Sequence, residues 1–336
     1  MKLATYKDGS RDGQLVVVSR DLSTAHYATG ITSRLQQVLD DWGFLAPQLQ
    51  DLYETLNHGK ARHAFAFDPK MCMAPLPRAY QWVDGSAYTH HVELIRGAAN
   101  QDLPERLGAE PLLSQRASDD FLGPCDDVLC SDESLGIDFG AKVAVITADV
   151  PMQTTSDRAL ESIRLVTLAN DVTLRNLASV ECAAGQALLR SKPATAFSPV
   201  AVTVDELGDS WNEGRIHLIL QSTWNGRRVG MCDAGADMTF HFGQLIAHLC
   251  KSRNLRAGSL VSGGVVCNRD IETQGKRDWP KGYSSIVDKR ATETILNGQP
   301  STEFMKFADT IRIEMKGQDG LSVFGAIEQT IESLTA

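Results

Sequence analysis

One stretch near the middle of the chain constrains its fold more than any other. Residues 136–146 read Gly-Ile-Asp-Phe-Gly-Ala-Lys-Val-Ala-Val-Ile, a turn-forming glycine followed by apolar and β-branched residues. That pattern is typical of a strand buried in a sheet. Side chains alternate between the two faces of a strand, so positions 138, 140 and 142 are expected on one face and 139, 141 and 143 on the other. The pattern therefore places Lys142 inside a buried strand, pointing the same way as Asp138.

A lysine in such a strand needs an explanation. An unpaired buried ammonium costs several kcal/mol, so Lys142 must contact a carboxylate, reach a wet cavity or lose its proton. The alternative is an edge-strand lysine in solvent, since lysines are rarely fully buried. Spacing alone slightly favours the exposed lysine. The other segments of the chain favour the buried one.

Composition limits the class of protein. The 336 residues are 43% hydrophobic and 22% charged, enough for a substantial core in one large and one small domain. The net charge is −9, and without a basic run nucleic acid is excluded as a partner. No stretch reaches the roughly 18 apolar residues of a membrane span and the N-terminus lacks a signal peptide, so a cytoplasmic protein without a membrane partner is expected. Seven scattered cysteines indicate no disulfide framework.

Residues 1–75 are predicted to form a small α/β domain. A strand over 14–19 lies between turn signals, and apolar residues at helical spacing predict a helical hairpin that breaks at Pro47. Residues 76–336 form the second predicted domain, mainly β. Its expected elements are strands at 163–169, 216–224, 227–231, 283–287 and 311–315, a helix near 240–251, a glycine-rich turn at 257–264, and irregular or charged loops at 98–134 and 268–282.

Several polar residues follow the predicted strands. Asp84 ends a turn and His91 lies seven residues further, so both could border one cavity if a helix starts near Ser86. Asp171 follows the 163–169 strand, and Lys192 lies in a proline-flanked segment. Each has a structural alternative: a lone histidine is more often structural, an aspartate after a strand is as often a helix cap, and the lysine is equally typical of a surface loop.

Taken together, the motifs resemble the fumarylacetoacetate hydrolase family, in particular its long bacterial members with an extra N-terminal domain. The matching segments cover nearly the whole chain and come in the family's order: 2–20, 82–88 (Trp-Val-Asp-Gly-Ser-Ala-Tyr), 91–94, 118–124 (Ser-Asp-Asp-Phe-Leu-Gly-Pro), 170–176, 191–199 and 324–329. The resemblance implies an α+β, mainly β fold, with a mixed β-roll catalytic domain behind a small α/β domain. It also implies a homodimer that acts on 1,3-diketo acids or related oxo acids.

The resemblance assigns roles to individual residues. The family holds a divalent cation, usually Mg²⁺ or Ca²⁺, with two aspartates that match Asp84 and Asp171 and a Glu-x-Glu pair that falls on Gly140 and Lys142. Its water-activating dyad matches His91 and Asp288, a shortened carboxylate. The resemblance also implies that Arg175 and Lys192 stabilise charge and that Tyr88, Ser114 and Ser259 bind substrate. Ser114 replaces a tyrosine of the family and Arg116 a glycine.

The changed ligands alter the expected chemistry. A hard divalent cation needs about six oxygen ligands, and two aspartates beside an ammonium supply too few, so no tightly bound cofactor is expected. The alternative is weak binding of Mg²⁺ or Ca²⁺ at Asp84 and Asp171. We expect Lys142 to replace the ion as an electrophile in a hydrolase of carbon–carbon bonds in a small 1,3-dicarbonyl or acylpyruvate-like molecule. A decarboxylase, tautomerase or lyase on a related oxo acid, or a non-catalytic binding protein, are the alternatives.

Overall fold

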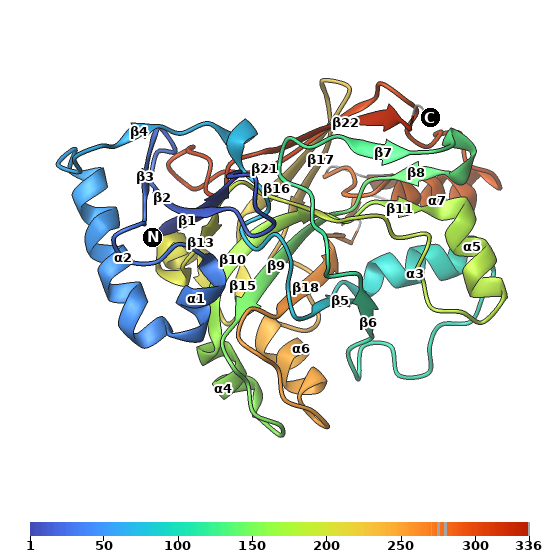
Figure 1. Ribbon diagram of the computed structural model, residues 1–336. Helices are drawn as coiled ribbons and strands as arrows, with labels where there is room; N and C mark the ends of the chain where they lie inside the picture. The colour runs from blue at the N-terminus through green and yellow to red at the C-terminus, as the bar shows by residue number, and fades with distance from the viewer. Residues whose placement is uncertain (270, 274–275, 279–280, 335–336) are drawn as a thin grey trace.

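A long mixed sheet forms the centre of the computed structural model, which describes residues 1–269, 271–273, 276–278 and 281–334. Within these residues the sheet has 11 strands, in the order β4-β3-β2-β1-β13-β10-β9-β18-β5-β6, with β12 paired to β10 (Figure 1). The bounds are β1 Lys2–Tyr6, β2 Gln14–Val18, β3 Thr24–Tyr27, β4 Phe65–Ala66, β5 Trp82–Gly85, β6 Leu113–Arg116, β9 Ala141–Thr147, β10 Ile163–Asn170, β12 Ala196–Phe197, β13 Ala201–Val202 and β18 Leu260–Val265.

Two N-terminal helices, α1 (Leu35–Asp40) and α2 (Trp42–Asn57), contribute to the core on one side of this sheet. Two helices are present in the region where a helical hairpin was expected, but the predicted break at Pro47 is wrong: the helices part at Asp41, and Pro47 lies inside α2. Proline costs the helix one backbone hydrogen bond, and α2 continues because Leu49 and Tyr53 bury its apolar face.

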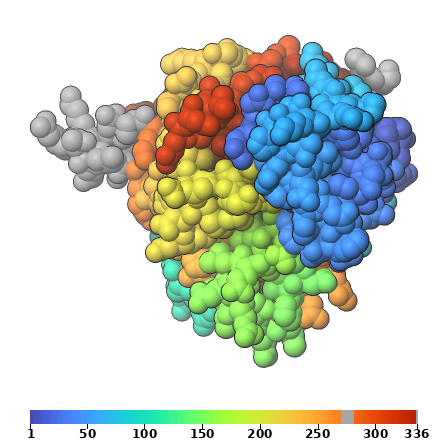
Figure 2. Space-filling model, turned by 90° about the vertical axis from the view of Figure 1, so that its left-hand side faces the viewer, coloured from blue at the N-terminus to red at the C-terminus, as the bar shows by residue number. Residues whose placement is uncertain are grey.

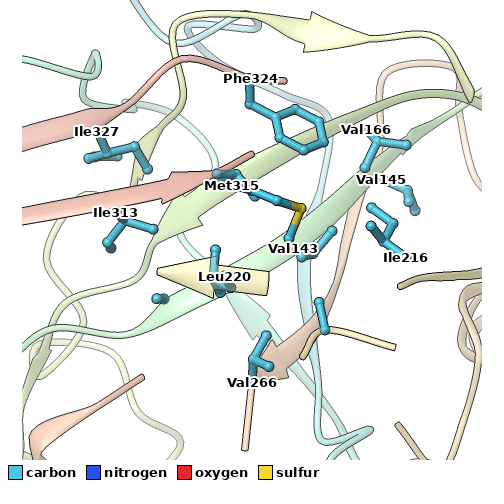
Figure 3. Close-up of a cluster of buried hydrophobic side chains, with 14 of the residues drawn as sticks. Val143, Val145, Val166, Ile216, Leu220, Val266, Ile313, Met315, Phe324 and Ile327 are labelled. Carbon is cyan, nitrogen blue, oxygen red and sulfur yellow. The ribbon is translucent and has the colours of Figure 1, made fainter. Parts of the chain in front are cut away.

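The other face of the long sheet packs on a second sheet, ordered β17-β16-β21-β22-β7. Its strands are β7 Val128–Cys130, β16 Ile219–Trp224, β17 Arg227–Asp233, β21 Thr310–Met315 and β22 Ile327–Ser333. Figure 3 shows Val143 and Val145 of β9 in this core with Leu220 and Met315. Because side chains alternate along β9, Lys142 and Ala144 lie on the opposite face. The predicted alternation of positions 141–146 is therefore confirmed.

The remaining elements surround the sheets. Helices α3 (Thr89–Ala98), α5 (Arg175–Ala183) and α7 (Ile286–Asn297) lie together at the end of the molecule opposite α1 and α2, while α4 (Ser156–Glu161) and α6 (Phe242–Leu249) pack on each other elsewhere (Figure 1). Smaller elements are 3₁₀ turns at Pro69–Met71, Glu133–Leu135 and Val204–Ser210, and the pairs β8 (Ile137–Asp138) with β11 (Thr173–Leu174), β14 (Trp211–Asn212) with β15 (Arg215–Ile216), and β19 (Ile271–Thr273) with β20 (Lys276–Asp278).

The α+β fold is confirmed, and so is the hairpin of β16 and β17, whose turn residues Asn225 and Gly226 have the positive φ angles of 48° and 72° that this turn requires.

Three other local predictions are wrong. The 136–146 strand is interrupted at residues 139–140, so that β8 and β9 join different sheets. Residues 283–287 run into α7 instead of forming a strand. Residues 260–265 form β18, where a Cβ on Gly264 would lie 2.2 Å from the carbonyl oxygen of Gly85.

The N-terminal segment is continuous with the rest of the structure, because β1 pairs with β13 and thereby joins β10. In Figure 2 the blue N-terminal residues lie directly against the yellow, green and red parts of the chain. The boundary at residue 75 stays a prediction. In the described part of the chain, no helix is long and apolar enough to cross a membrane. Residues 270, 274–275 and 279–280 of the predicted 268–282 loop lie outside the described residues.

Candidate active site

A cavity of about 810 Å³ opens where α3, α5 and α7 meet the ends of strands β5, β6 and β9. Its walls combine apolar side chains with cations. The lining includes Tyr88, His91, Val92, Ile95, Leu112, Val265, Val287 and Phe304, together with Asp84, Ser114 and the cationic residues Arg96, Arg116, Lys142, Arg175, Lys192 and Arg290. A concave, partly apolar cavity with several convergent charged groups is the usual form of a small-molecule site.

Neighbouring strands supply the floor of this cavity. Lys142 lies on β9 between β10 and β18, in register with Ala169 on one side and Val265 on the other. Asp171 follows the last residue of β10, while Asp84 lies on β5, which is parallel to β18. Because adjacent strands are about 5 Å apart, residues at the same ends of β10, β9 and β5 converge.

The Lys142 ammonium lies directly between the two aspartates. Its Nζ is 2.7 Å from Asp84 Oδ1 and 2.5 Å from Asp171 Oδ2. The side chain is 1% exposed, so the edge-strand alternative does not hold. Asp138 is not a partner of Lys142, because the interruption at residues 139–140 separates them.

Other side chains donate further hydrogen bonds to both aspartates. Asp84 accepts hydrogen bonds from Arg116 Nη2 at 2.8 Å and from the Ser262 hydroxyl at 2.5 Å. Asp171 accepts one from Lys192 Nζ at 2.8 Å, and its Oδ2 lies 3.6 Å from Arg116 Nε. Buried carboxylates that are fully paired in this way stay ionised.

The pKa values of these groups respond to burial and to one another. Burial alone would raise the pKa of Asp84, but Lys142 and Arg116 outweigh it and the pKa lies below the ordinary value. The same balance, with Lys192 added, holds the pKa of Asp171 well below its usual range. Burial lowers the pKa of Lys192 to about 7; Asp171 opposes this shift, and Lys142 and Arg116 add to it.

A histidine–aspartate pair forms another part of the site. His91 Nδ1 lies 2.6 Å from Asp288 Oδ1, joining α3 to α7. Asp288 is 1% exposed, whereas His91 lines the cavity. Since Nδ1 is used by the aspartate, Nε2 is the ring nitrogen available to take a proton from a bound water.

Arg175 is held by a buried carboxylate that sequence reasoning did not assign to it. Its Nε lies 2.8 Å from Asp138 Oδ2, and Asp138 also accepts the backbone N–H groups of Ile286 and Val287 at 2.6 and 3.2 Å. Burial raises the pKa of Asp138, and Arg175 opposes that shift. Asp138 thus connects Arg175 to the first turn of α7, the helix that carries Asp288.

The structure brings most of the expected site residues together. Tyr88 and Ser114 line the same cavity, although the Tyr88 hydroxyl donates to the Ala234 carbonyl. Ser259 is not among the lining residues; it is buried and donates to the Arg256 carbonyl. The resemblance noted Arg116 only as replacing a glycine and gave it no role. A second signal was its two-residue spacing from Ser114, which places both on one face of β6.

Comparison with known proteins agrees with this architecture. The fumarylacetoacetate hydrolase C-terminal family matches residues 81–332, and the fumarylacetoacetase N-terminal domain 2 family matches residues 1–78. The chain therefore belongs to the fumarylacetoacetate hydrolase family, as the motifs predicted.

Individual relatives are distant. An uncharacterized protein of Archaeoglobus fulgidus is 26% identical over 181 residues, which are 54% of this chain and 65% of that protein. The maleylpyruvate hydrolase of Sphingobium sp. SYK-6, solved with manganese(II) and pyruvate, is 13% identical, with a TM-score of 0.64 and 99% of each chain covered. The 5-carboxymethyl-2-hydroxymuconate delta-isomerase of Mycobacterium smegmatis is 14% identical, with a TM-score of 0.59 and full coverage of both chains. These two structures share the fold.

A divalent cation of the kind seen in that hydrolase does not fit the residues present here. The ammonium of Lys142 is within hydrogen-bond distance of both aspartates and so lies where an ion bridging them would have to be. In the described residues, no three His, Cys, Asp or Glu side chains are grouped to hold a metal ion. Three cations around two carboxylates would also repel Mg²⁺, which prefers an octahedral shell of oxygen ligands.

Gly140, which the resemblance aligned with a ligand of the family's metal, is closely packed. Its carbonyl accepts the Asp171 backbone N–H at 2.9 Å, and a Cβ on Gly140 would lie 2.7 Å from the Asp171 carbonyl oxygen. A glutamate could not be placed at this position without moving Asp171. The absence of a side chain at position 140 therefore allows the close approach of the Gly140 and Asp171 backbones.

We expect Gly140→Ala to destabilise the protein by about 1–3 kcal/mol, the usual cost of overpacking a rigid interior. Urea denaturation measures it. The matched control is Gly30→Ala, where an added Cβ meets nothing within 4 Å and a change within about 0.5 kcal/mol is expected. Equal stability of the two variants would mean that Gly140 is not packed against Asp171 as described.

Proposed function

We propose that this chain is a hydrolase that cleaves a carbon–carbon bond in a 1,3-dicarbonyl or acylpyruvate-like oxo acid, with Lys142 in the place of the family's divalent cation. The observation that carries the proposal is the buried Lys142 ammonium, held between Asp84 and Asp171 on the floor of a cavity that His91 also lines. The family and its fold make an enzyme acting on oxo acids the expected class.

In this proposal His91 and Asp288 activate a water molecule as the nucleophile. His91 Nε2 removes a proton from water while Asp288 holds the ring through Nδ1 and stabilises the imidazolium that forms. The hydroxide adds to the acyl carbonyl carbon farther from the carboxylate. The bond from that carbon to the methylene carbon then breaks, giving a carboxylic acid and the enolate of the remaining oxo acid.

The cations stabilise the negative charge that develops. An ammonium fixed by two carboxylates is already oriented before the reaction, so Lys142 can polarise the ketone and its enolate without a reorganisation cost. Lys192 and Arg175 line the same cavity and would stabilise the tetrahedral oxyanion. Protonation of the enolate carbon by the His91 imidazolium completes the cycle and returns the dyad to its starting state.

The proposal predicts turnover without a metal. Protein dialysed against EDTA is assayed with acylpyruvates and with linear and cyclic 1,3-diketones, and the products are identified by mass spectrometry. We expect hydrolysis of at least one substrate at a rate unaffected by the chelator, and His91→Ala should lower that rate by about 10²-fold or more.

The neighbouring His90 is the matched control, because it contacts Glu93 and does not line the cavity. His90→Ala should keep near wild-type turnover. A rate abolished by EDTA and restored by Mg²⁺ would contradict the metal-independent mechanism. Isomerised or decarboxylated products would instead identify one of the alternative reactions.

Replacing Lys142 tests its role directly. In Lys142→Met the two aspartates lose the cation between them, so the pKa of at least one should rise, and breaking this buried ion pair should cost about 3 kcal/mol or more of stability. Turnover should fall below detection at a temperature where circular dichroism shows the variant folded.

The control is Lys306→Met, which removes an exposed lysine paired with Glu303. A stability change within about 0.5 kcal/mol and full turnover are expected there. If Lys142→Met behaves like Lys306→Met, the ammonium has no part in the reaction.

A further inference from the structure

Cations dominate the walls of the cavity. Among the described residues, one carboxylate, Asp84, lines it, against five cationic side chains, Arg96, Arg116, Lys142, Arg175 and Arg290, and against Lys192, whose pKa burial lowers to about 7. Asp171 and Asp288 are nearly fully buried and do not line it. A cavity walled by one sign of charge concentrates ligands of the opposite sign. The lining of this cavity therefore suits an anionic ligand better than a cationic one.

Arg116 gives the floor of the cavity its clearest anion-binding group. The residue is 9% exposed and lines the cavity beside Lys142. A guanidinium carries five N–H donors and is always charged. Within the described part of the chain, its only hydrogen bond runs from Nη2 to Asp84, and Nε is buried without a hydrogen-bond partner.

The two aspartates cannot use the remaining donors. Asp84 already accepts hydrogen bonds from Arg116, Lys142 and Ser262. Asp171 accepts them from Lys142, Lys192 and the Thr195 hydroxyl. Nε lies 3.6 Å from Asp171, too far for a good hydrogen bond. Arg116 is therefore a buried, permanently charged donor with unused N–H groups beside a cavity of about 810 Å³.

We propose that Arg116 and Lys142 together form a metal-free binding site for the carboxylate of an oxo acid, so that an anion, and not a cation, completes this cluster. A planar carboxylate can accept two parallel N–H groups from a guanidinium, whereas a single ammonium offers no such fork. The identity of the anion rests on the proposed function. The binding site itself rests on the position and unused donors of Arg116.

Isothermal titration calorimetry tests this site without any turnover. The full-length protein is dialysed against EDTA and titrated with oxalate, a stable dicarboxylate. We expect saturable binding of one oxalate per chain, with an affinity that does not change when EDTA is present throughout. Arg116→Gln should weaken the affinity at least tenfold, because it removes a charged hydrogen-bond donor.

Two further variants make the test selective. Arg116→Lys keeps the positive charge but loses the paired N–H groups of the guanidinium, so its affinity for oxalate should be several-fold weaker. If Arg116→Gln does not fold, Arg116→Lys alone tests whether Arg116 binds oxalate. Arg164→Gln is the control, because Arg164 contacts the Trp42 ring and does not line the cavity. Its affinity for oxalate should equal that of the wild type.

Three results would overturn the proposal: no oxalate binding by the metal-free wild type, binding that appears only after Mg²⁺ is added, or unchanged affinity in both Arg116 variants. These results are separable from a failure of the proposed hydrolase. Tight, Arg116-dependent oxalate binding without turnover of any diketone would support the anion site and reject the hydrolase. Turnover without oxalate binding would support the hydrolase and reject the anion site.

Discussion

A single buried positive charge determines how this site is built. Lys142 lies in the middle of the long sheet, where an ammonium without partners would cost several kcal/mol. Asp84 on β5 and Asp171 after β10 remove that cost by contacting the same nitrogen. Because breaking such a pair leaves uncompensated buried charges, the three strand ends are held in fixed relation. The cavity above them takes its shape from this arrangement.

Three residues of the site, Gly140, Lys142 and Arg116, are spatially linked through the two aspartates. Lys142 takes the position between the aspartates, and Gly140, without a side chain, lets the chain approach the Asp171 backbone. Arg116 adds a second cation on Asp84, so the cluster has more positive than negative charge. Each change alone would leave a clash, a vacant ligand position or an unpaired charge. In our proposal these residues together make a site that attracts an anion instead of a metal ion.

Sequence reasoning predicted the fold and most of the cavity, because motif order and strand alternation are local signals. Alternation placed Lys142 and Val143 on opposite faces of β9, as the structure has them. Alternation failed at Asp138, because β8 pairs with β11 and the Gly140 backbone bonds to Asn170 and Asp171, contacts between distant residues that no local pattern encodes. Arg116 could not be assigned for a related reason: its partners lie more than 30 residues away and become neighbours only through the pairing of β5 with β6 and β18.

A crystal grown or soaked with manganese(II), with diffraction measured at the manganese absorption edge, tests most directly whether Lys142 excludes a metal ion from the space between Asp84 and Asp171. We expect continuous electron density for the Lys142 side chain between Asp84 and Asp171, and no anomalous peak within about 3 Å of either carboxylate, since oxygen ligands lie about 2.0–2.6 Å from hard divalent cations. An anomalous peak bonded to both aspartates, with the Lys142 side chain displaced, would contradict this expectation.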